Sequence, residues 1–366
     1  MQYPVKQLNR RLAIAIAVSL GTIFSGCNQP PPPPTASNSP EKLDITVSIL
    51  PQKYFVERIG GENVNVNVMV EPGSSPATYE PKPQQLKLLS QAEAYMSIGV
   101  PFENAWMDRI EAANPKMQIV DTTEGIELLP MVAHHHHHEE GHHDEGHHDE
   151  GHHDEGHHDE GHHDEGHHDE GDVHHKEGVE NFDPHIWVSP KLVKLQAQTI
   201  YEALVKLDPT RQPEYEASLQ QFLADIDELD KEIRQTLAGV QNRKFMVFHP
   251  SWGYFANDYN LEMIPIEIGG QEPSAAELAE LIAEAKEEGI QVIFVQPEFS
   301  TRDAETIANQ IGGEVIAIGP LELNWLENLR NLSHAFAKVL SLESEIERLS
   351  FTQHEKGLLV MSVSGK

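Results

Sequence analysis

The chain has 366 residues, with 26 Lys and Arg against 59 Asp and Glu, and a net charge of −33 when His is neutral. This length suits two ordinary domains. So acidic a chain lacks the clustered Lys and Arg that nucleic-acid binding requires, and it favours cationic partners.

The N-terminus has the pattern of an export signal. Lys6, Arg10 and Arg11 precede a predominantly apolar segment of 13 residues, Leu12 to Phe24, which is too short for a comfortable membrane span. The run ends in FSGC, which is similar to a bacterial lipobox with Phe in place of the usual Leu. Because Cys27 is the single Cys, no intramolecular disulfide can form, and we expect Cys27 to carry a lipid.

The predicted signal peptide therefore spans residues 1–27, and a Pro-rich tether follows over residues 28–42. A run of five Pro favours an extended, stiff backbone. We expect a mature protein that is exported to the periplasm or cell surface and is held at the membrane by its lipid.

Short β-prone segments alternate with helical ones in two series, which predicts parallel sheets wound with helices. The fold class is therefore α/β, with two doubly wound lobes over residues 43–212 and 241–340. The tail over 341–366 has no assigned role, although its first part could extend the last helix. The expected strands lie at 44–50, 64–70, 94–99, 117–122, 244–250, 262–268, 291–297 and 314–320.

A long helix is predicted between the lobes, over residues 213–240. Apolar residues recur there at helical spacing, and the chain has no Pro or Gly from Glu214 to Ala238. Such a helix is on the order of 35 Å long, which suits a rigid strut between the lobes better than a hinge.

Residues 134–180 form a His- and acid-rich insertion within the first lobe. The pentad GHHDE repeats six times from Gly141 to Glu170, and the insertion holds 17 acidic residues against Lys176 alone. A segment of this composition cannot bury a core, so we expect it to be disordered. Imidazole nitrogens with nearby carboxylates favour zinc or another divalent transition metal, and Gly gives the backbone freedom to gather them. The alternative is that the segment has no function and is a replication-slippage tract or part of a cloning tag.

The predicted accessory metal ligands are the 19 His of this insertion. They are His134, His135, His136, His137, His138, His142, His143, His147, His148, His152, His153, His157, His158, His162, His163, His167, His168, His174 and His175.

Two of the four remaining His have contexts that indicate a binding site. His249 directly follows an apolar strand, where α/β sheets place their ligands. His185 follows Asp-Pro and precedes an aromatic residue, just before a predicted helix. His334 and His354 lie in the C-terminal region without such a context, and we expect them at the surface.

Four motifs together resemble those of the zinc and manganese solute-binding proteins of ABC importers, the ZnuA-like group. They are DPHIWVSP, FHPSWGYFANDYNL, PGSSPATYEPKP and GVPFENAW, and the resemblance runs from about Leu43 to Leu340. It implies two α/β lobes joined by one long helix, a metal site in the cleft between them, no enzymatic activity, and an importer permease as partner. We expect a monomer, and zinc as cargo, with manganese or another divalent transition metal as the alternative.

The resemblance implies three His and one carboxylate, or two His and two carboxylates, as metal ligands. His185 and His249 match two of these positions, but Ala77 and Gly319 stand at the other two and cannot bind a metal. A carboxylate could substitute, Glu298 before Glu322. Water could instead complete the coordination, or a His from the insertion could enter the cleft.

Capture of zinc for an importer is therefore the leading hypothesis. The alternative is a membrane-anchored metal buffer or sensor that binds through GHHDE while its cleft has decayed. A metallohydrolase is a third interpretation, since two His with an open coordination position could activate water, but no further catalytic group is evident.

Overall fold

The computed structural model describes residues 42–131, 182–268 and 270–341. The export segment, Cys27, the tether, the GHHDE repeat with its 19 His, and the tail from residue 342 lie outside them. Within the described part of the chain, no helix is both long and apolar enough to cross a membrane.

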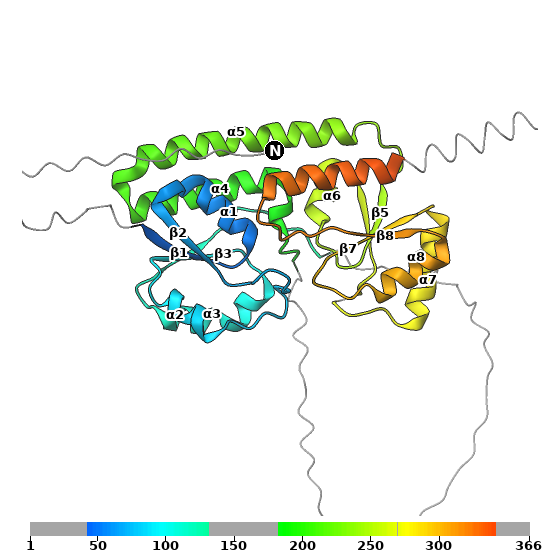
Figure 1. The fold of residues 1–366 in the computed structure, drawn as a ribbon, viewed down its shortest axis with the longest axis horizontal. Coiled ribbons are helices and arrows are strands. Elements are labelled where there is room, and N and C mark those ends of the chain that lie inside the picture. The colour runs from blue at the N-terminus through cyan, green and yellow to red at the C-terminus, as the bar shows by residue number, and fades with distance from the viewer. Residues whose placement is uncertain (1–41, 132–181, 269, 342–366) are drawn as a thin grey trace, which may run out of the picture. The chain divides into compact units, whose positions relative to one another are not determined.

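The first lobe is built on a sheet of four parallel strands in the order β2-β1-β3-β4 (Figure 1). Its strands lie within or one residue beyond the segments predicted from the sequence, but they are shorter at their carboxyl ends. After β1 the chain turns straight into a helix with Pro51 in its first turn, a position that Pro favours. The strands are β1 (Leu43–Val47), β2 (Val64–Val68), β3 (Ala94–Ser97) and β4 (Gln118–Asp121).

Helices connect these strands, as parallel pairing requires. In Figure 1, α1 and α4 lie on one side of the sheet, and α2 and α3 lie on the other. The helices are α1 (Leu50–Gly60), α2 (Pro83–Leu89), α3 (Pro101–Ala113) and α4 (Pro190–Leu207), with 3₁₀ turns at η1 (Gly61–Asn63), η2 (Ile186–Val188) and η3 (Pro209–Arg211).

The second lobe repeats this arrangement, with the parallel order β6-β5-β7-β8. Phe245 and Val247 of β5 face a core shared with the first lobe, while Met246 and Phe248 join a separate core under α7 and α8. Burial on both faces is the expected state of a parallel sheet. The elements are β5 (Lys244–Val247), α6 (Gly253–Tyr259), β6 (Glu262–Pro265), α7 (Ala275–Glu287), β7 (Val292–Val295), α8 (Arg302–Ile311) and β8 (Glu314–Ala317), followed by a helix over 325–341.

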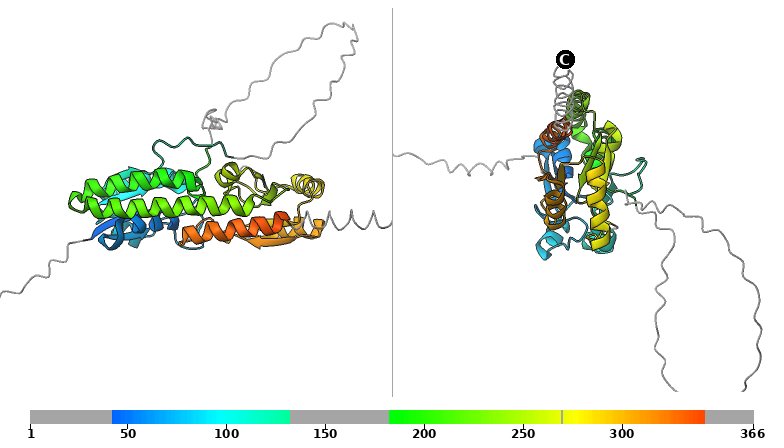
Figure 2. Two further views of the ribbon diagram at one scale, coloured as in Figure 1. Left: turned by 90° about the horizontal axis from the view of Figure 1, so that it is seen from above. Right: turned by 90° about the vertical axis from the view of Figure 1, so that its right-hand side faces the viewer.

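The long helix α5 (Gln212–Leu237) connects the two sheets and contacts both lobes (Figures 1 and 2). It begins and ends within three residues of the predicted bounds. Asp225 pairs with Arg58 of the first lobe, and five residues further along Asp230 accepts a 2.9 Å hydrogen bond from the Tyr259 hydroxyl of the second lobe. The fold is thus the predicted pair of α/β lobes joined by one long helix.

In both sheets the chain winds in opposite directions from the first strand, so the strand order reverses between β1 and β3, and between β5 and β7. α/β proteins place their ligands at the carboxyl ends of the strands at such a switch point. The residues that follow β3, β5 and β7 therefore mark where a binding site is to be sought.

Candidate metal site

His185 lies in a turn that its own neighbour closes. The Asp183 carboxylate accepts hydrogen bonds from the backbone N–H of His185 at 2.9 Å and from its Nδ1 at 2.6 Å through the same oxygen. Both side chains are nearly inaccessible to solvent, at 10% and 1% exposure for His185 and Asp183. A buried carboxylate on Nδ1 holds the ring in one orientation and leaves Nε2 as the nitrogen available to a metal.

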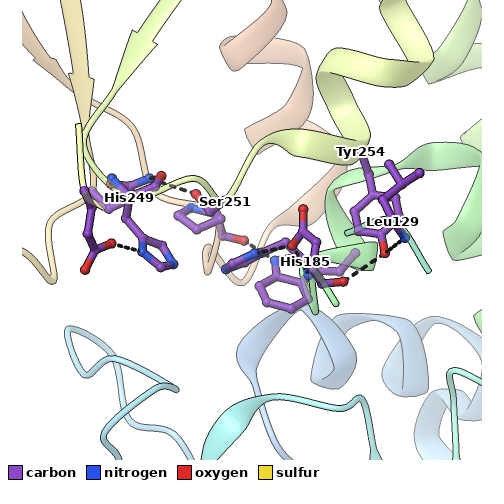
Figure 3. A network of polar contacts seen from close by, with 10 residues as sticks. Leu129, His185, His249, Ser251 and Tyr254 are labelled. Atoms are coloured by element: carbon purple, nitrogen blue, oxygen red, sulfur yellow. Dashed lines mark hydrogen bonds and ion pairs between the residues drawn. The ribbon is translucent and has the colours of Figure 1, made fainter. Parts of the chain in front are cut away.

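The second lobe holds Asp183 in place through Tyr254, which Figure 3 shows beside Leu129 and near His185. The Tyr254 hydroxyl of α6 donates to the Asp183 carbonyl at 2.8 Å and accepts from the Leu129 N–H at 3.0 Å. A Cβ atom on Gly253 would fall 2.6 Å from Asp183 Oδ2, so only Gly permits this close approach. The orientation of His185 thus depends on residues of both lobes.

The indole rings of Trp187 and Trp325 connect the His185 turn to the second lobe. Trp187 Nε1 donates to the Pro320 carbonyl at 2.9 Å, and Trp325 Nε1 donates to the Trp187 carbonyl at 2.6 Å. Trp187 also packs on His185, with ring centroids 5.1 Å apart. Because both indoles are buried, these bonds link the lobes beside the site.

His249 lies two residues after the end of β5, and long-range contacts fix it. The Gln296 amide, which follows β7, accepts from the His249 N–H at 3.2 Å and donates to its carbonyl at 2.6 Å. The Glu267 carboxylate, which follows β6, binds Nδ1. The Phe299 ring stacks on the imidazole at 4.7 Å and 20°. His249 therefore also has Nδ1 occupied by a carboxylate.

The electrostatics of His249 favour the neutral ring that a metal needs. Burial lowers its pKa, against the opposing effect of the Glu267 hydrogen bond, and the net direction is downward. A neutral imidazole whose Nδ1–H is held by a carboxylate presents its Nε2 lone pair as a basic ligand.

The two imidazoles come from opposite lobes and face each other, with centroids 5.2 Å apart and planes at 72°. At a Zn–N bond of about 2.1 Å, a ring centroid lies about 3.2 Å from the ion, so two rings at the tetrahedral angle have centroids about 5.2 Å apart. The observed spacing therefore fits one tetrahedral metal ion bound by both rings. In the described residues, no cluster of three or more His, Cys, Asp or Glu completes such a site.

A cavity of about 360 Å³ opens in front of the two rings, lined by residues of both lobes. Ala77 and Glu298 line it, whereas Glu322 is not among the described residues that do. Glu322 instead lies beside Gly319, 3.4 Å from where a Cβ of that residue would be. The structure thus places Glu298 at the cavity of the two His, whereas Glu322 lines two neighbouring hollows, one of which it shares with Glu298.

Glu298 is partly buried, and burial raises its pKa, as does the charge of Glu322, while His249 lowers it. His334 is exposed, as expected. Cys27, His354 and the 19 His of the repeat lie outside the described residues.

The sequence interpretation missed the two carboxylates that orient the rings. Asp183 had a signal, since it stands two residues before His185 within the quoted motif. Glu267 had a weaker one, as an acidic residue just past a buried strand. Several residues follow the carboxyl ends of strands in this sheet, and the strand order decides which of them reaches His249.

The model of the ZnuA family, described as "Zinc-uptake complex component A periplasmic", matches residues 45–339. This match covers well over half of the chain, which therefore belongs to that family of periplasmic zinc-uptake components.

Among curated relatives, the chain is 28% identical over 286 residues to the zinc-binding protein AdcA of Streptococcus pyogenes serotype M3, covering 77% of this chain and 51% of AdcA. It thus spans about half the length of these first relatives. It is 27% identical over 308 residues to the high-affinity zinc uptake system protein ZnuA of Bacillus subtilis strain 168, covering 82% of this chain and 85% of that protein.

A solved structure described as "138-173 ZnuA deletion mutant plus zinc bound" is 42% identical, with a TM-score of 0.67. The similarity covers 82% of this chain and 98% of that one.

Proposed function

We propose that this chain is an extracytoplasmic solute-binding protein that captures zinc between its lobes and delivers it to an ABC importer permease. The observation that carries the proposal is the pair of imidazoles from opposite lobes, 5.2 Å apart, each with Nδ1 bound to a buried carboxylate. The names of the relatives, zinc-binding protein AdcA and high-affinity zinc uptake ZnuA, support zinc as the cargo.

In this proposal His185 and His249 bind the ion through Nε2, and Asp183 and Glu267 orient the rings. Glu298 is our candidate for a third protein ligand, because among the described residues it is the carboxylate that lines the same cavity. A binding protein must also release its cargo, and an ion held by few protein ligands is easier to release than one in a closed four-ligand site.

The GHHDE repeat is then an accessory that concentrates zinc beside the cleft, since many imidazoles on one chain raise the local metal concentration. A 42% identical ZnuA that lacks its residues 138–173 has been solved with zinc bound, which supports zinc binding by a chain of this family outside one internal segment. Cys27 would carry the lipid that holds the mature protein, acting as a monomer, at the membrane surface, with residues 28–42 as its tether.

The test is a zinc competition titration against a calibrated chelator at neutral pH. We would compare the mature chain, the chain without residues 134–175, and that shorter chain carrying His185→Ala or His249→Ala. The proposal predicts one tight site in the shorter chain that either substitution weakens by at least about a hundredfold, because one imidazole alone is a poor zinc site. His334→Ala, an exposed His, is the matched control and should change nothing.

The titration also separates the proposal from the buffer or sensor hypothesis. If tight binding disappears with residues 134–175 and the two Ala substitutions have no effect, the repeat is the binding site and the cleft proposal is wrong.

A further inference from the structure

The described cleft leaves zinc short of ligands. Zinc in proteins is almost always four-coordinate, yet the two imidazoles supply two nitrogens, and Ala77 contributes only a methyl group to the same cavity. Two coordination positions are therefore open to Glu298, to water, to a His of the insertion, or to a molecule that enters with the ion.

The cavity is far larger than an ion needs. Its volume is about 360 Å³, whereas one water molecule takes about 30 Å³ in the liquid. Cavities from about 300 Å³ upward are the ones that hold small organic ligands. The space in front of His185 and His249 is thus sufficient for a zinc ion together with a compact organic molecule.

The walls of this cavity are chiefly apolar and come from both lobes. The first lobe contributes Leu128 and Met131 near the described end of its segment, and the second contributes Phe299 and Leu321. Apolar walls gain nothing from water, but they stabilise an aliphatic or aromatic side chain by about 25 cal/mol per Å² of buried surface. A hydrated zinc ion would not bury this apolar surface.

The charges around the cavity select among possible molecules. Of the described lining residues, Glu298 is the one carboxylate and none is Lys or Arg, while Asp183 and Glu267 stand directly behind the rings. A polyanionic chelator such as citrate would make a negative zinc complex and be repelled. A singly charged amino carboxylate makes a complex of charge +1, which these carboxylates attract.

We propose that the cargo is a zinc–amino acid complex, in which the amine nitrogen and one carboxylate oxygen complete the tetrahedral coordination begun by His185 and His249. The amino acid loses its ammonium proton to solvent when its nitrogen binds zinc, and its apolar side chain lies against Leu128 and Phe299. Asn104 and Ser75 also line the cavity, and we assign them the hydrogen bonds to the free carboxylate oxygen. This inference rests on the proposed function and names its substrate class.

The test is equilibrium dialysis of radiolabelled L-leucine with the full mature chain, without zinc and with enough zinc to saturate both the cleft and the GHHDE repeat, beside the His185→Ala/His249→Ala double variant. The double variant keeps the GHHDE repeat, so the difference between the two chains reports the cleft alone. We expect one leucine retained per chain only when zinc is present, and at least about tenfold less in the double variant. Citrate and L-aspartate should compete poorly.

Ala77 provides an independent variant. Ala77→His adds a protein ligand at the cavity, so zinc alone should bind at least about tenfold more tightly while zinc-dependent leucine retention falls. Ala77→Leu adds bulk without a ligand and should reduce leucine retention with no gain in zinc affinity.

Failure of this inference is distinguishable from failure of the proposed function. If the double variant loses one tight zinc site but wild type retains no leucine with zinc, the cargo is the ion alone and the inference is overturned. If the double variant keeps every zinc site of the wild type, the proposed function itself is wrong.

Discussion

The two halves of the site orient their imidazoles in different ways. His185 takes its carboxylate from Asp183, two residues away, and the pair is buried as one rigid turn. His249 takes its carboxylate from Glu267, 18 residues away on a neighbouring strand end, and its backbone is held by Gln296, 47 residues away. The His185 half is a local motif that contacts with the second lobe then hold in place. The His249 half forms only once the strands of the second sheet have paired.

This difference predicts different sensitivities. The His185 turn should be upset by anything that moves Asp183, including changes in the other lobe, while the His249 half should depend on the individual side chains that reach it. The following substitutions test the contrast, from the largest expected effect to the smallest.

Gly253→Ala should have the largest effect, although Gly253 belongs to the second lobe and does not line the cavity. Its Cβ would lie 2.6 Å from Asp183 Oδ2, so the carboxylate must move and His185 with it. We expect zinc affinity to fall by about a hundredfold, and the free energy of unfolding to fall by about 1–3 kcal/mol. Competition titration and thermal melts measure both. Gly239→Ala, which meets no atom within 4 Å, is the matched control and should leave both unchanged.

Asp183→Asn should weaken zinc binding by about ten- to a hundredfold, because an amide oxygen is a weaker acceptor for Nδ1–H and leaves Nε2 less basic. The buried side chain keeps its shape, so circular dichroism should be unchanged while the titration shifts. Equal affinity in Asp183→Asn and wild type would contradict the role of this carboxylate.

Glu267→Gln should act in the same direction but less strongly, since Phe299 and Gln296 also hold His249. About tenfold is expected. The informative comparison is the double variant with Phe299→Ala, where the loss should exceed the sum of the two single effects because both contacts fix one ring.

Tyr254→Phe should have the smallest effect. It removes the hydroxyl that donates to the Asp183 carbonyl and accepts from Leu129, and it leaves the ring in place. We expect a loss of about 0.5–1.5 kcal/mol in the free energy of unfolding and a change in zinc affinity of only a few fold. A loss as large as that of Gly253→Ala would mean that the hydroxyl, and not the close approach of α6, holds the His185 turn.

The sequence predicted the fold well because its signals are local. Each predicted strand segment contains or adjoins one observed strand, and the long helix has a buried residue at nearly every turn from Tyr215 to Leu237, so its periodicity is strong. Strand ends were less predictable. After β1 the apolar run continues into α1, and burial alone does not tell a strand from the first turn of a helix.

The site was predictable only in part, for the same physical reason. His185 and His249 could be singled out from adjacent residues, but the partners of His249 are set by the β6-β5-β7 strand order. The sequence ranks Glu298 before Glu322 without deciding between them, and the structure separates them in space, where Glu298 lines the cavity and Glu322 lies beside Gly319. Their role as ligands stays a prediction.

The central claim is that one zinc ion is bound jointly by an imidazole from each lobe. The most direct measurement is a crystal structure of the zinc-loaded chain without residues 134–175, with anomalous diffraction recorded at the zinc absorption edge. The account predicts one strong peak about 2.1 Å from Nε2 of both His185 and His249. A peak bound to only one of them, or no peak between the lobes while zinc still binds tightly in solution, would contradict it.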